Sequence, residues 1–203
     1  TVKGFDLADK YRMTAMILAD GTMGQMMEPV SLPEEEVDPA EAAKGKPWAV
    51  TGTACARKHN IINSLYLKPD ELEKTNLERF ERYAALESEV RWEEYLMEDA
   101  EICVVSTGIT ARVSKNAIVE CRRRGIKVGM IRPITLYPFP AKPLAEAAEK
   151  VKSFLTVELN MGQMNEDVRL AIGCKKPVSM CNRVGGMIPS TDEVISAIEK
   201  EAK

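Results

Sequence analysis

The stretch Ile102-Cys103-Val104-Val105-Ser106-Thr107-Gly108 decides the fold class of this 203-residue chain. Its apolar run ends in a Thr-Gly pair, which predicts a buried strand followed directly by a turn. A helical pattern continues through Val113 and Ala117 to Cys121. Arg122-Arg123-Arg124 and Gly125 follow, and both positive charge and a left-handed residue favour a helix end there. The stretch therefore predicts one strand–turn–helix unit.

The same unit recurs further along the chain. Apolar runs predict strands at residues 127–131, 154–157 and 177–181, and helices are expected from Pro143 and from Asn160 to about Gly173. A last helix begins at the capping box formed by Ser190 and Glu193. Strands that alternate with helices predict an α/β fold over residues 97–203. We expect a doubly wound, mostly parallel sheet with helices on both faces and the strand at Ile102 in its centre.

Residues 1–45 form a first zone that differs from this pattern. Apolar residues between Phe5 and Tyr11 predict the end of a helix, and the apolar run at 13–19 predicts a buried strand that stops at Asp20-Gly21. One strand and part of a helix cannot bury themselves. We therefore expect this zone to belong to a larger domain, with the first residue at a cut or processed end.

Residues 46–96 are predicted to form a connector with a charged helix. Prolines and the acidic triplet Glu34-Glu35-Glu36 indicate an extended approach to it. From Pro69 to about Tyr95, apolar residues recur at helical steps among many charges, and acidic residues follow Pro69 where the helix dipole favours them. This pattern is typical of a helix with one solvated face.

Composition excludes several classes of function. The chain is 45% hydrophobic and 29% charged, with a formal net charge of -3, so we expect neither a nucleic-acid partner nor a membrane segment. Five scattered cysteines form no Cys-x-x-Cys pair, and His59 is the only histidine. Zinc or a cysteine-ligated iron–sulfur cluster is therefore not expected in this chain. Free cysteines favour a reducing cytoplasm.

Two further motifs have simple structural explanations. The turn at residues 106–112 would lie at the carboxyl edge of a parallel sheet, where ligands usually bind. It holds only Gly108 and lacks the G-x-G-x-x-G fingerprint, which argues against a free nucleotide-dependent oxidoreductase, and no P-loop lysine motif occurs. Arg122-Arg123-Arg124 could bind a phosphate or an acidic partner, but charge at a helix end already explains it.

Two stretches, at residues 20–29 and 158–163, combine carboxylates, amides and glycines just past a predicted strand. Such loops often carry functional sites. A mobile connector explains the first equally well, and helix capping or an interface explains the second. The candidate interface or active-site residues in these stretches are Asp20, Gly21, Gln25, Glu28, Glu158, Asn160, Gly162 and Gln163.

These stretches carry a resemblance to the C-terminal part of the α-type subunit of 2-oxoacid:ferredoxin oxidoreductases. Asp20-Gly21 followed by Gly24-Gln25-Met26-Met27-Glu28-Pro29-Val30 resembles the end of the family's pyrimidine-binding domain. The segment from Gly125 to Pro140 (GIKVGMIRPITLYPFP) is similar to the long loop of its second domain, and Glu158-Leu159-Asn160-Met161-Gly162-Gln163 to that domain's third strand–helix junction. The connector sequence from Asn60 to Leu67 (NIINSLYL) resembles the branched-chain, 2-oxoisovalerate form.

The resemblance implies a domain organisation and a reaction. Residues 1–45 would be the tail of the pyrimidine-binding domain, 46–96 the connector, and 97–203 a transketolase C-terminal-like domain. In the family, thiamine diphosphate decarboxylates a 2-oxoacid, electrons pass through iron–sulfur clusters to ferredoxin, and coenzyme A collects the acyl group. The 2-oxoglutarate or pyruvate form of the enzyme, and a non-catalytic assembly domain, remain alternatives.

The resemblance also places the cofactors outside this chain. Partner subunits would bind thiamine diphosphate, magnesium and the clusters: a thiamine-diphosphate/iron–sulfur subunit, a gamma subunit and a ferredoxin-like subunit. The chain itself would then hold no catalytic, cofactor-binding or metal residue, and alone it would be inactive.

Overall fold

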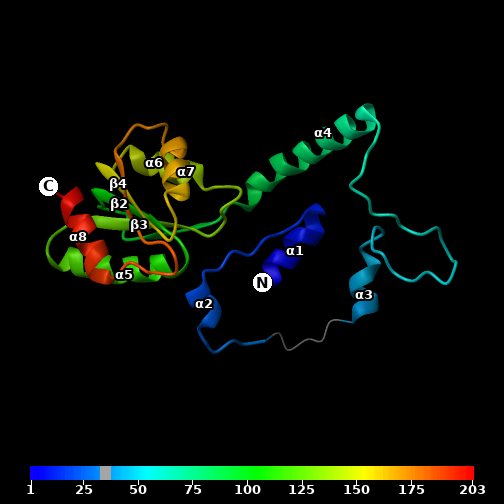
Figure 1. The fold of residues 1–203 in the computed structure, drawn as a ribbon, viewed down its shortest axis with the longest axis horizontal. Coiled ribbons are helices and arrows are strands. Elements are labelled where there is room, and N and C mark those ends of the chain that lie inside the picture. Colours follow the sequence, from blue (N-terminus) through cyan, green and yellow to red (C-terminus); the bar gives the residue numbers. More distant parts are fainter. Residues whose placement is uncertain (33–37) are drawn as a thin grey trace. The chain divides into compact units, whose positions relative to one another are not determined.

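The computed structural model describes residues 1–32 and 38–203 (Figure 1), and its internal contacts divide the chain into two units. One unit combines Thr1–Met26 with Arg82–Lys203, and the other comprises Met27–Glu81. Every fully buried hydrophobic side chain among the described residues lies between Ala100 and Ile198. The predicted α/β region is therefore where the core forms. The predicted acidic triplet Glu34-Glu35-Glu36 lies outside the described residues.

The core is a five-stranded sheet with strand order β1-β3-β2-β4-β5. The strands are β1 (Trp92–Tyr95), β2 (Ile102–Ser106), β3 (Val128–Pro133), β4 (Ser153–Glu158) and β5 (Val178–Asn182). β2 pairs in parallel with β3 and β4, and β4 pairs in parallel with β5. The predicted mostly parallel sheet with the strand at Ile102 in its centre is confirmed.

Helices cover both faces of the sheet, as the doubly wound prediction requires (Figure 1). On one face, α5 (Gly108–Arg123) and α8 (Thr191–Glu201) pack on alternate strand residues such as Val104 and Leu155. On the other face, α6 (Ala141–Ala148) and α7 (Gln163–Ala171) pack on the intervening residues, including Phe154. Because side chains alternate across a strand, β2 and β4 are buried on both faces, which explains why apolar residues predominate in both strands.

The helix ends follow the predicted signals. Gly125 takes φ +85° just beyond α5, a conformation that glycine adopts without strain. The Ser190 hydroxyl accepts the Glu193 N–H, and the Glu193 carboxylate accepts the Ser190 N–H, so the predicted capping box at α8 is confirmed.

The edge strand β1 was missed, because the helix predicted from Pro69 to about Tyr95 ends earlier. α4 (Pro69–Ala85) gives way to the short 3-10 helix η1 (Leu86–Glu89), and β1 then pairs antiparallel with β3. The carboxylate of Glu93 lies between Lys115 of α5 and Arg132 of β3. Long-range ion pairs therefore place this charged segment in the sheet, which a local helical pattern could not reveal.

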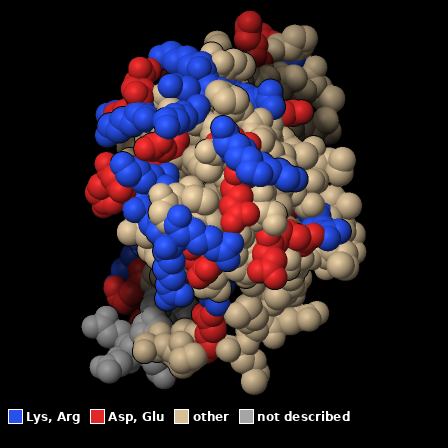
Figure 2. Space-filling view, turned by 90° about the vertical axis from the view of Figure 1, so that its left-hand side faces the viewer, with Lys and Arg blue, Asp and Glu red and all other residues tan. Residues whose placement is uncertain are grey.

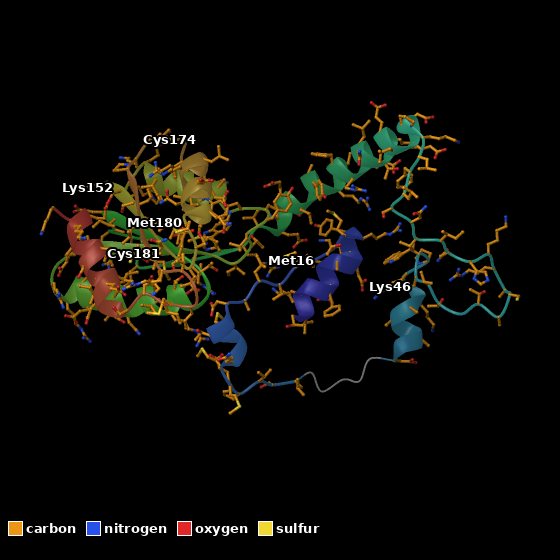
Figure 3. All side chains as sticks on the ribbon, viewed as in Figure 1. Met16, Lys46, Lys152, Cys174, Met180 and Cys181 are labelled. Atoms are coloured by element: carbon orange, nitrogen blue, oxygen red, sulfur yellow. The ribbon has the colours of Figure 1, made fainter. Side chains whose placement is uncertain are left out.

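The predicted buried strand at residues 13–19 is wrong. This segment follows α1 (Val2–Tyr11), has neither helix nor strand hydrogen bonding, and leaves the Met16 side chain 77% exposed (Figure 3). An apolar run forms a buried strand only where a neighbouring strand accepts its peptide groups. Among the described residues no such neighbour is present.

The unit formed by Met27–Glu81 contains α3 (Pro39–Lys44) and most of α4. It contributes no fully buried hydrophobic side chain among its described residues, and Leu77 of α4 is 64% exposed. The charged helix predicted to begin at Pro69 is confirmed. The division into domains at residues 45 and 96 stays a prediction.

Candidate functional site

The carboxyl ends of β2 and β4 form the most distinctive edge of the sheet. The chain passes from β2 to β3 on one side and returns to β4 on the other, so the topological switch point lies between β2 and β4. Open parallel sheets bind their ligands at this place. The Ser106 hydroxyl donates to the Val157 carbonyl at 3.1 Å and ties the two strand ends together.

Asp20 lies at this edge although it is far away in the sequence. It is the N-cap of α2 (Gly21–Gln25), where its Oδ1 accepts the Met23 N–H at 2.8 Å. Its Oδ2 accepts the Ile109 N–H at 2.9 Å, in the first turn of α5. One carboxylate thus satisfies orphan N–H groups of two helices.

Gly108 makes this contact possible. Its φ is +62°, and a Cβ there would lie 2.8 Å from the Asp20 Oδ2. A glycine is therefore required both for the backbone and for the close approach of Asp20. The helix N-terminus that could attract a phosphate already faces the chain's own carboxylate, which agrees with the missing dinucleotide fingerprint.

Glu158 ends β4 and caps α7 from within the fold. Its side chain is 3% exposed, and its two oxygens accept the N–H groups of Met164 at 2.9 Å and Asn165 at 3.0 Å. A buried carboxylate is tolerated where hydrogen bonds compensate its lost hydration. The expected shielding and hydrogen bonding of Glu158 are confirmed, and capping explains this residue.

The rest of the predicted junction shapes the same turn. The Asn160 Oδ1 accepts the N–H groups of Gly162 at 2.8 Å and Gln163 at 3.0 Å. Gly162 takes φ +108° at the N-cap of α7, while the Gln163 side chain is exposed. The backbone N–H of Gln163 thus helps to form this turn, whereas its side chain is exposed.

The structure brings only part of the predicted set together. Asp20 and Gly21 lie beside the β2–α5 turn, and Glu158 ends the neighbouring strand β4. Gln25 is exposed at the end of α2. Glu28 belongs to the other unit, so its relation to this edge is not defined. The site assignment stays a prediction.

Sequence reasoning missed two asparagines at this edge. Asn182 lies opposite Glu158 in register and donates to the Asn160 carbonyl at 2.7 Å. Asn165 is buried and donates to Thr156 at 3.0 Å and to the Ser179 carbonyl at 3.1 Å. Asn182 could have been predicted, because an asparagine at the end of a largely apolar strand is unusual. No local sequence pattern indicates a role for Asn165.

The arginine cluster is occupied by ion pairs. Arg122 contacts Asp99 at 2.8 Å and donates to the Val128 and Leu96 carbonyls, and Arg124 contacts Glu199 at 2.8 Å. Figure 2 shows cationic and anionic side chains interspersed on one face of the molecule. A helix-end role therefore accounts for this cluster.

The described residues offer no ligand set for a metal. No group of three His, Cys, Asp or Glu side chains among them could hold an ion. Burial raises the pKa of Cys103 to about 12 and also raises the pKa of Cys121, so both remain thiols and act as small apolar residues, as expected. None of the helices in the described part of the chain has the length and apolar character to span a membrane.

Comparisons with known proteins agree with this architecture. Residues 100–194 match the family model "Pyruvate:ferredoxin oxidoreductase core domain II". Ketoisovalerate oxidoreductase subunit VorB of Methanothermobacter marburgensis is 45% identical over all 203 residues, which correspond to 56% of that protein. 2-Oxoglutarate synthase subunit KorA of the same organism is 27% identical over 98% of this chain and 59% of its own length. The chain thus spans just over half the length of these relatives.

A solved structure extends the likeness to the fold. The 2-oxoglutarate:ferredoxin oxidoreductase from Magnetococcus marinus superposes with a TM-score of 0.70 at 20% identity, over 100% of this chain and 40% of that one. The matched residues 100–194 coincide with most of the sheet and the switch-point edge. Residues 100–194 of this chain are thus similar to pyruvate:ferredoxin oxidoreductase core domain II, and the whole chain is similar to a ketoisovalerate oxidoreductase subunit.

Proposed function

We propose that this chain forms part of the α-type subunit of a 2-oxoacid:ferredoxin oxidoreductase that acts on the branched-chain 2-oxoacid 3-methyl-2-oxobutanoate. The observation that carries the proposal is the 45% identity to a ketoisovalerate oxidoreductase subunit over every residue, against 27% to a 2-oxoglutarate synthase subunit. The complex would form an acyl-CoA and reduce ferredoxin in the cytoplasm. Five free cysteines suit such a reducing compartment.

The described residues do not fit these cofactors. The diphosphate of thiamine diphosphate is held through magnesium, which prefers carboxylate oxygens, and iron–sulfur clusters need several thiolates. The described residues provide neither set, and Cys103 and Cys121 are buried on opposite faces of the sheet. We therefore propose that partner subunits bind these cofactors.

The chain would contribute a rigid surface, at the carboxyl ends of β2 and β4, on which partner subunits assemble. Asp20 and Glu158 are used within the fold, so they would act by holding two turns in place. Gln25 and Gln163 remain exposed on these turns. We propose that these two amides face a partner subunit or the approach to the active site.

Reconstitution tests the assignment. The subunit would be co-expressed with the thiamine-diphosphate/iron–sulfur, gamma and ferredoxin-like subunits and purified through a tag on this chain. The proposal expects co-purification and ferredoxin reduction that depends on 3-methyl-2-oxobutanoate and coenzyme A. Equal activity of the other subunits prepared without this chain would contradict the proposal. Preference for 2-oxoglutarate or pyruvate would assign another form of the enzyme.

The two exposed amides are tested in the same preparation. Gln25→Ala and Gln163→Ala should keep the melting temperature of the chain and weaken subunit assembly or acyl-CoA formation. Lys142→Ala, an exposed substitution on α6, provides the control. If both amide variants assemble and turn over like the parent, these residues are ordinary surface.

A further inference from the structure

The segment between α3 and α4 has an unusual distribution of charge. Asp and Glu make up 31 of the 203 residues, yet none lies between Glu41 and Asp70. We call residues 42–69 the cationic arm, because its charged side chains are all positive: Lys44, Lys46, Arg57, Lys58 and Lys68. A solvated surface ordinarily mixes charges of both signs, as does the face of the molecule in Figure 2. Solvation alone therefore does not explain the arm.

The arm contains an organised loop although residues 45–68 form neither helix nor strand (Figure 1). The Asn60 Nδ2 donates to the carbonyls of Pro47 at 2.6 Å and Ala49 at 3.0 Å, which closes residues 47–60 into a loop. The Arg57 guanidinium is held against backbone carbonyls of the same loop. Compact loops whose ends are held together are frequently functional.

The central cations of the arm have no carboxylate partner among the described residues. At the ends of the arm, Lys44 and Lys68 form ion pairs with glutamates of the flanking helices α3 and α4. In contrast, Arg57 donates only to carbonyl and hydroxyl oxygens, and the exposed Lys58 has no ion pair. A local excess of unpaired positive charge attracts and orients an anionic partner.

Large apolar side chains follow these cations directly. Ile61 is 85% exposed and Leu67 is 84% exposed, and Ile62 and Leu65 between them are exposed as well. Burial of such side chains against a partner stabilises a complex. A nucleic acid is bound mainly through its phosphate charges, which would leave this apolar group in water. The combination therefore fits a protein surface that carries both carboxylates and apolar side chains.

We propose that the cationic arm docks on an acidic, partly apolar surface of a partner subunit. Arg57 and Lys58 attract the carboxylates of that surface, and the apolar side chains from Ile61 to Leu67 are buried against it. The inference rests on the proposed function, because the partner is another subunit of the oxidoreductase complex.

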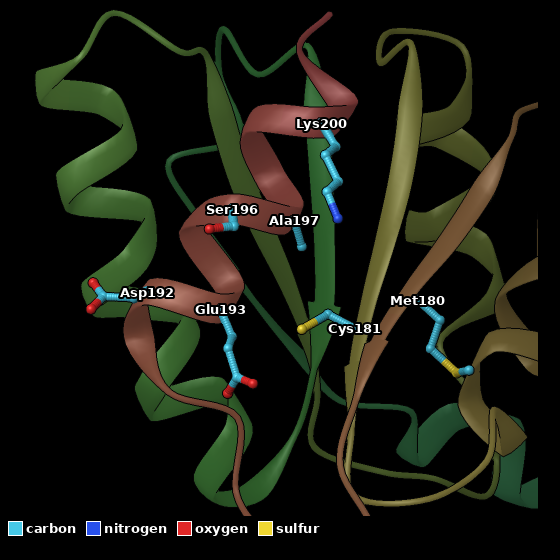
Figure 4. Close-up of a pocket in the computed structure, with 7 residues that line it drawn as sticks. All are labelled: Met180, Cys181, Asp192, Glu193, Ser196, Ala197 and Lys200. Atoms are coloured by element: carbon cyan, nitrogen blue, oxygen red, sulfur yellow. The ribbon is translucent and has the colours of Figure 1, made fainter.

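Charge reversal tests the electrostatic part of the docking. The partner subunits, purified together, would be bound to the immobilised chain at NaCl concentrations from about 50 to 500 mM. Lys58→Glu should raise the Kd about tenfold at the lowest salt concentration and should reduce its salt dependence. Lys200→Glu is the matched control, because it makes the same charge change on α8, at the groove between β5 and α8 (Figure 4). Equal effects of the two variants would overturn the proposal.

Substitution of the apolar residues distinguishes a protein partner from another polyanion. Ile61→Ser and Leu67→Ser should each raise the dissociation rate about tenfold at every salt concentration, because buried apolar contacts are not screened by ions. Leu170→Ser, at an 81% exposed position of α7, is the control. Unchanged circular dichroism shows that each variant is folded. Binding of both arm variants like the parent would overturn the proposal, as would a co-purifying nucleic acid that blocks the partner subunits.

A failure of docking is distinguishable from a failure of the substrate assignment. A complex that requires Lys58 and Ile61 for assembly but prefers another 2-oxoacid supports docking and contradicts the proposed substrate. A complex that uses 3-methyl-2-oxobutanoate and assembles equally well with Lys58→Glu and Ile61→Ser contradicts docking alone.

Discussion

Asp20 accepts the backbone N–H of Ile109 at 2.9 Å across 89 positions of sequence. The contact fixes the start of α2 to the start of α5, at the carboxyl end of the central strand β2. No short motif connects these residues. The contact therefore forms only when these distant parts of the chain fold together.

Replacing Asp20 should loosen both turns. Asp20→Ala removes two hydrogen bonds to helix N-termini, for which we expect a loss of about 1–2 kcal/mol of unfolding free energy, with a smaller loss for Asp20→Asn. Urea unfolding gives the free energy, and hydrogen exchange at the Met23 and Ile109 amides locates the change. Asp38→Ala, which removes the N-cap of α3, is the control and should leave the Ile109 amide protected. Unchanged exchange at Ile109 in Asp20→Ala would refute the described contact.

Gly108→Ala should disturb the same contact from the other side. The alanine would adopt φ +62° and place its Cβ 2.8 Å from the Asp20 Oδ2. Left-handed strain alone costs roughly 1–2 kcal/mol. Gly125→Ala controls for this strain, because its φ is +85° and no atom lies within 4 Å of the added Cβ. Gly108→Ala should lower the free energy of unfolding more than Gly125→Ala does. Combining Gly108→Ala with Asp20→Ala should remove only this additional loss, because the carboxylate that the Cβ would meet is then absent. Additive losses in the double variant would contradict the steric argument.

We expect Glu158 to stabilise the folded chain and to take no part in the reaction. Glu158→Ala leaves the Met164 and Asn165 amides without their acceptor, and each unsatisfied buried group costs roughly 1–3 kcal/mol. Glu158→Gln keeps the shape but only one carbonyl acceptor, so its loss should be smaller. Chemical unfolding measures both, with the exposed Glu166→Gln on α7 as control. In the complex, Glu158→Gln should retain turnover at temperatures where it is folded. Loss of turnover in a fully folded, assembled variant would instead indicate a role in the reaction.

Glu93 should make the stability of the chain depend on pH. The hydrogen bond from Lys115, followed by that from Arg132, holds the pKa of the Glu93 carboxyl below its usual value, although partial burial opposes this. The contribution is therefore fully present above the ordinary carboxyl pKa and is lost as the pH falls through the lower pKa of the folded state.

The comparison uses two neighbouring variants. Glu93→Gln should lose less stability than the parent when the pH is lowered from about 6 to 3. Glu94→Gln, whose carboxylate accepts from the Trp92 indole and not from a cation, should follow the parent. Equal pH profiles for the parent and Glu93→Gln would exclude the proposed contribution.

Residue patterns predict the central sheet because strands that are buried on both faces consist mainly of apolar residues. β2 is apolar as far as Ser106, β4 is interrupted only by Thr156 between Phe154 and Val157, and the last helix, α8, begins at a recognisable capping box. β1 was missed because Glu93 is stabilised by two cations that approach from other elements. The run around Met16 has strand-like composition, but a strand also needs a partner, which composition does not reveal.

The candidate site was only partly accessible from sequence. Glu158 could be selected because a carboxylate is unusual at the end of a buried strand, and the structure shows what it binds. The joining of Asp20 to α5, and the buried bridge from Asn165 to Ser179, depend on residues far apart in sequence or on different elements. Local periodicity carries no information on such contacts.

The substrate selectivity of the reconstituted complex tests the central claim most directly. Ferredoxin reduction would be followed with 3-methyl-2-oxobutanoate, 2-oxoglutarate and pyruvate at equal coenzyme A, and kcat/KM would be compared. The proposed function predicts the highest kcat/KM for 3-methyl-2-oxobutanoate, by at least about tenfold, which corresponds to about 1.4 kcal/mol in transition-state binding. A higher kcat/KM for 2-oxoglutarate or pyruvate, or no dependence of turnover on this chain, would contradict it.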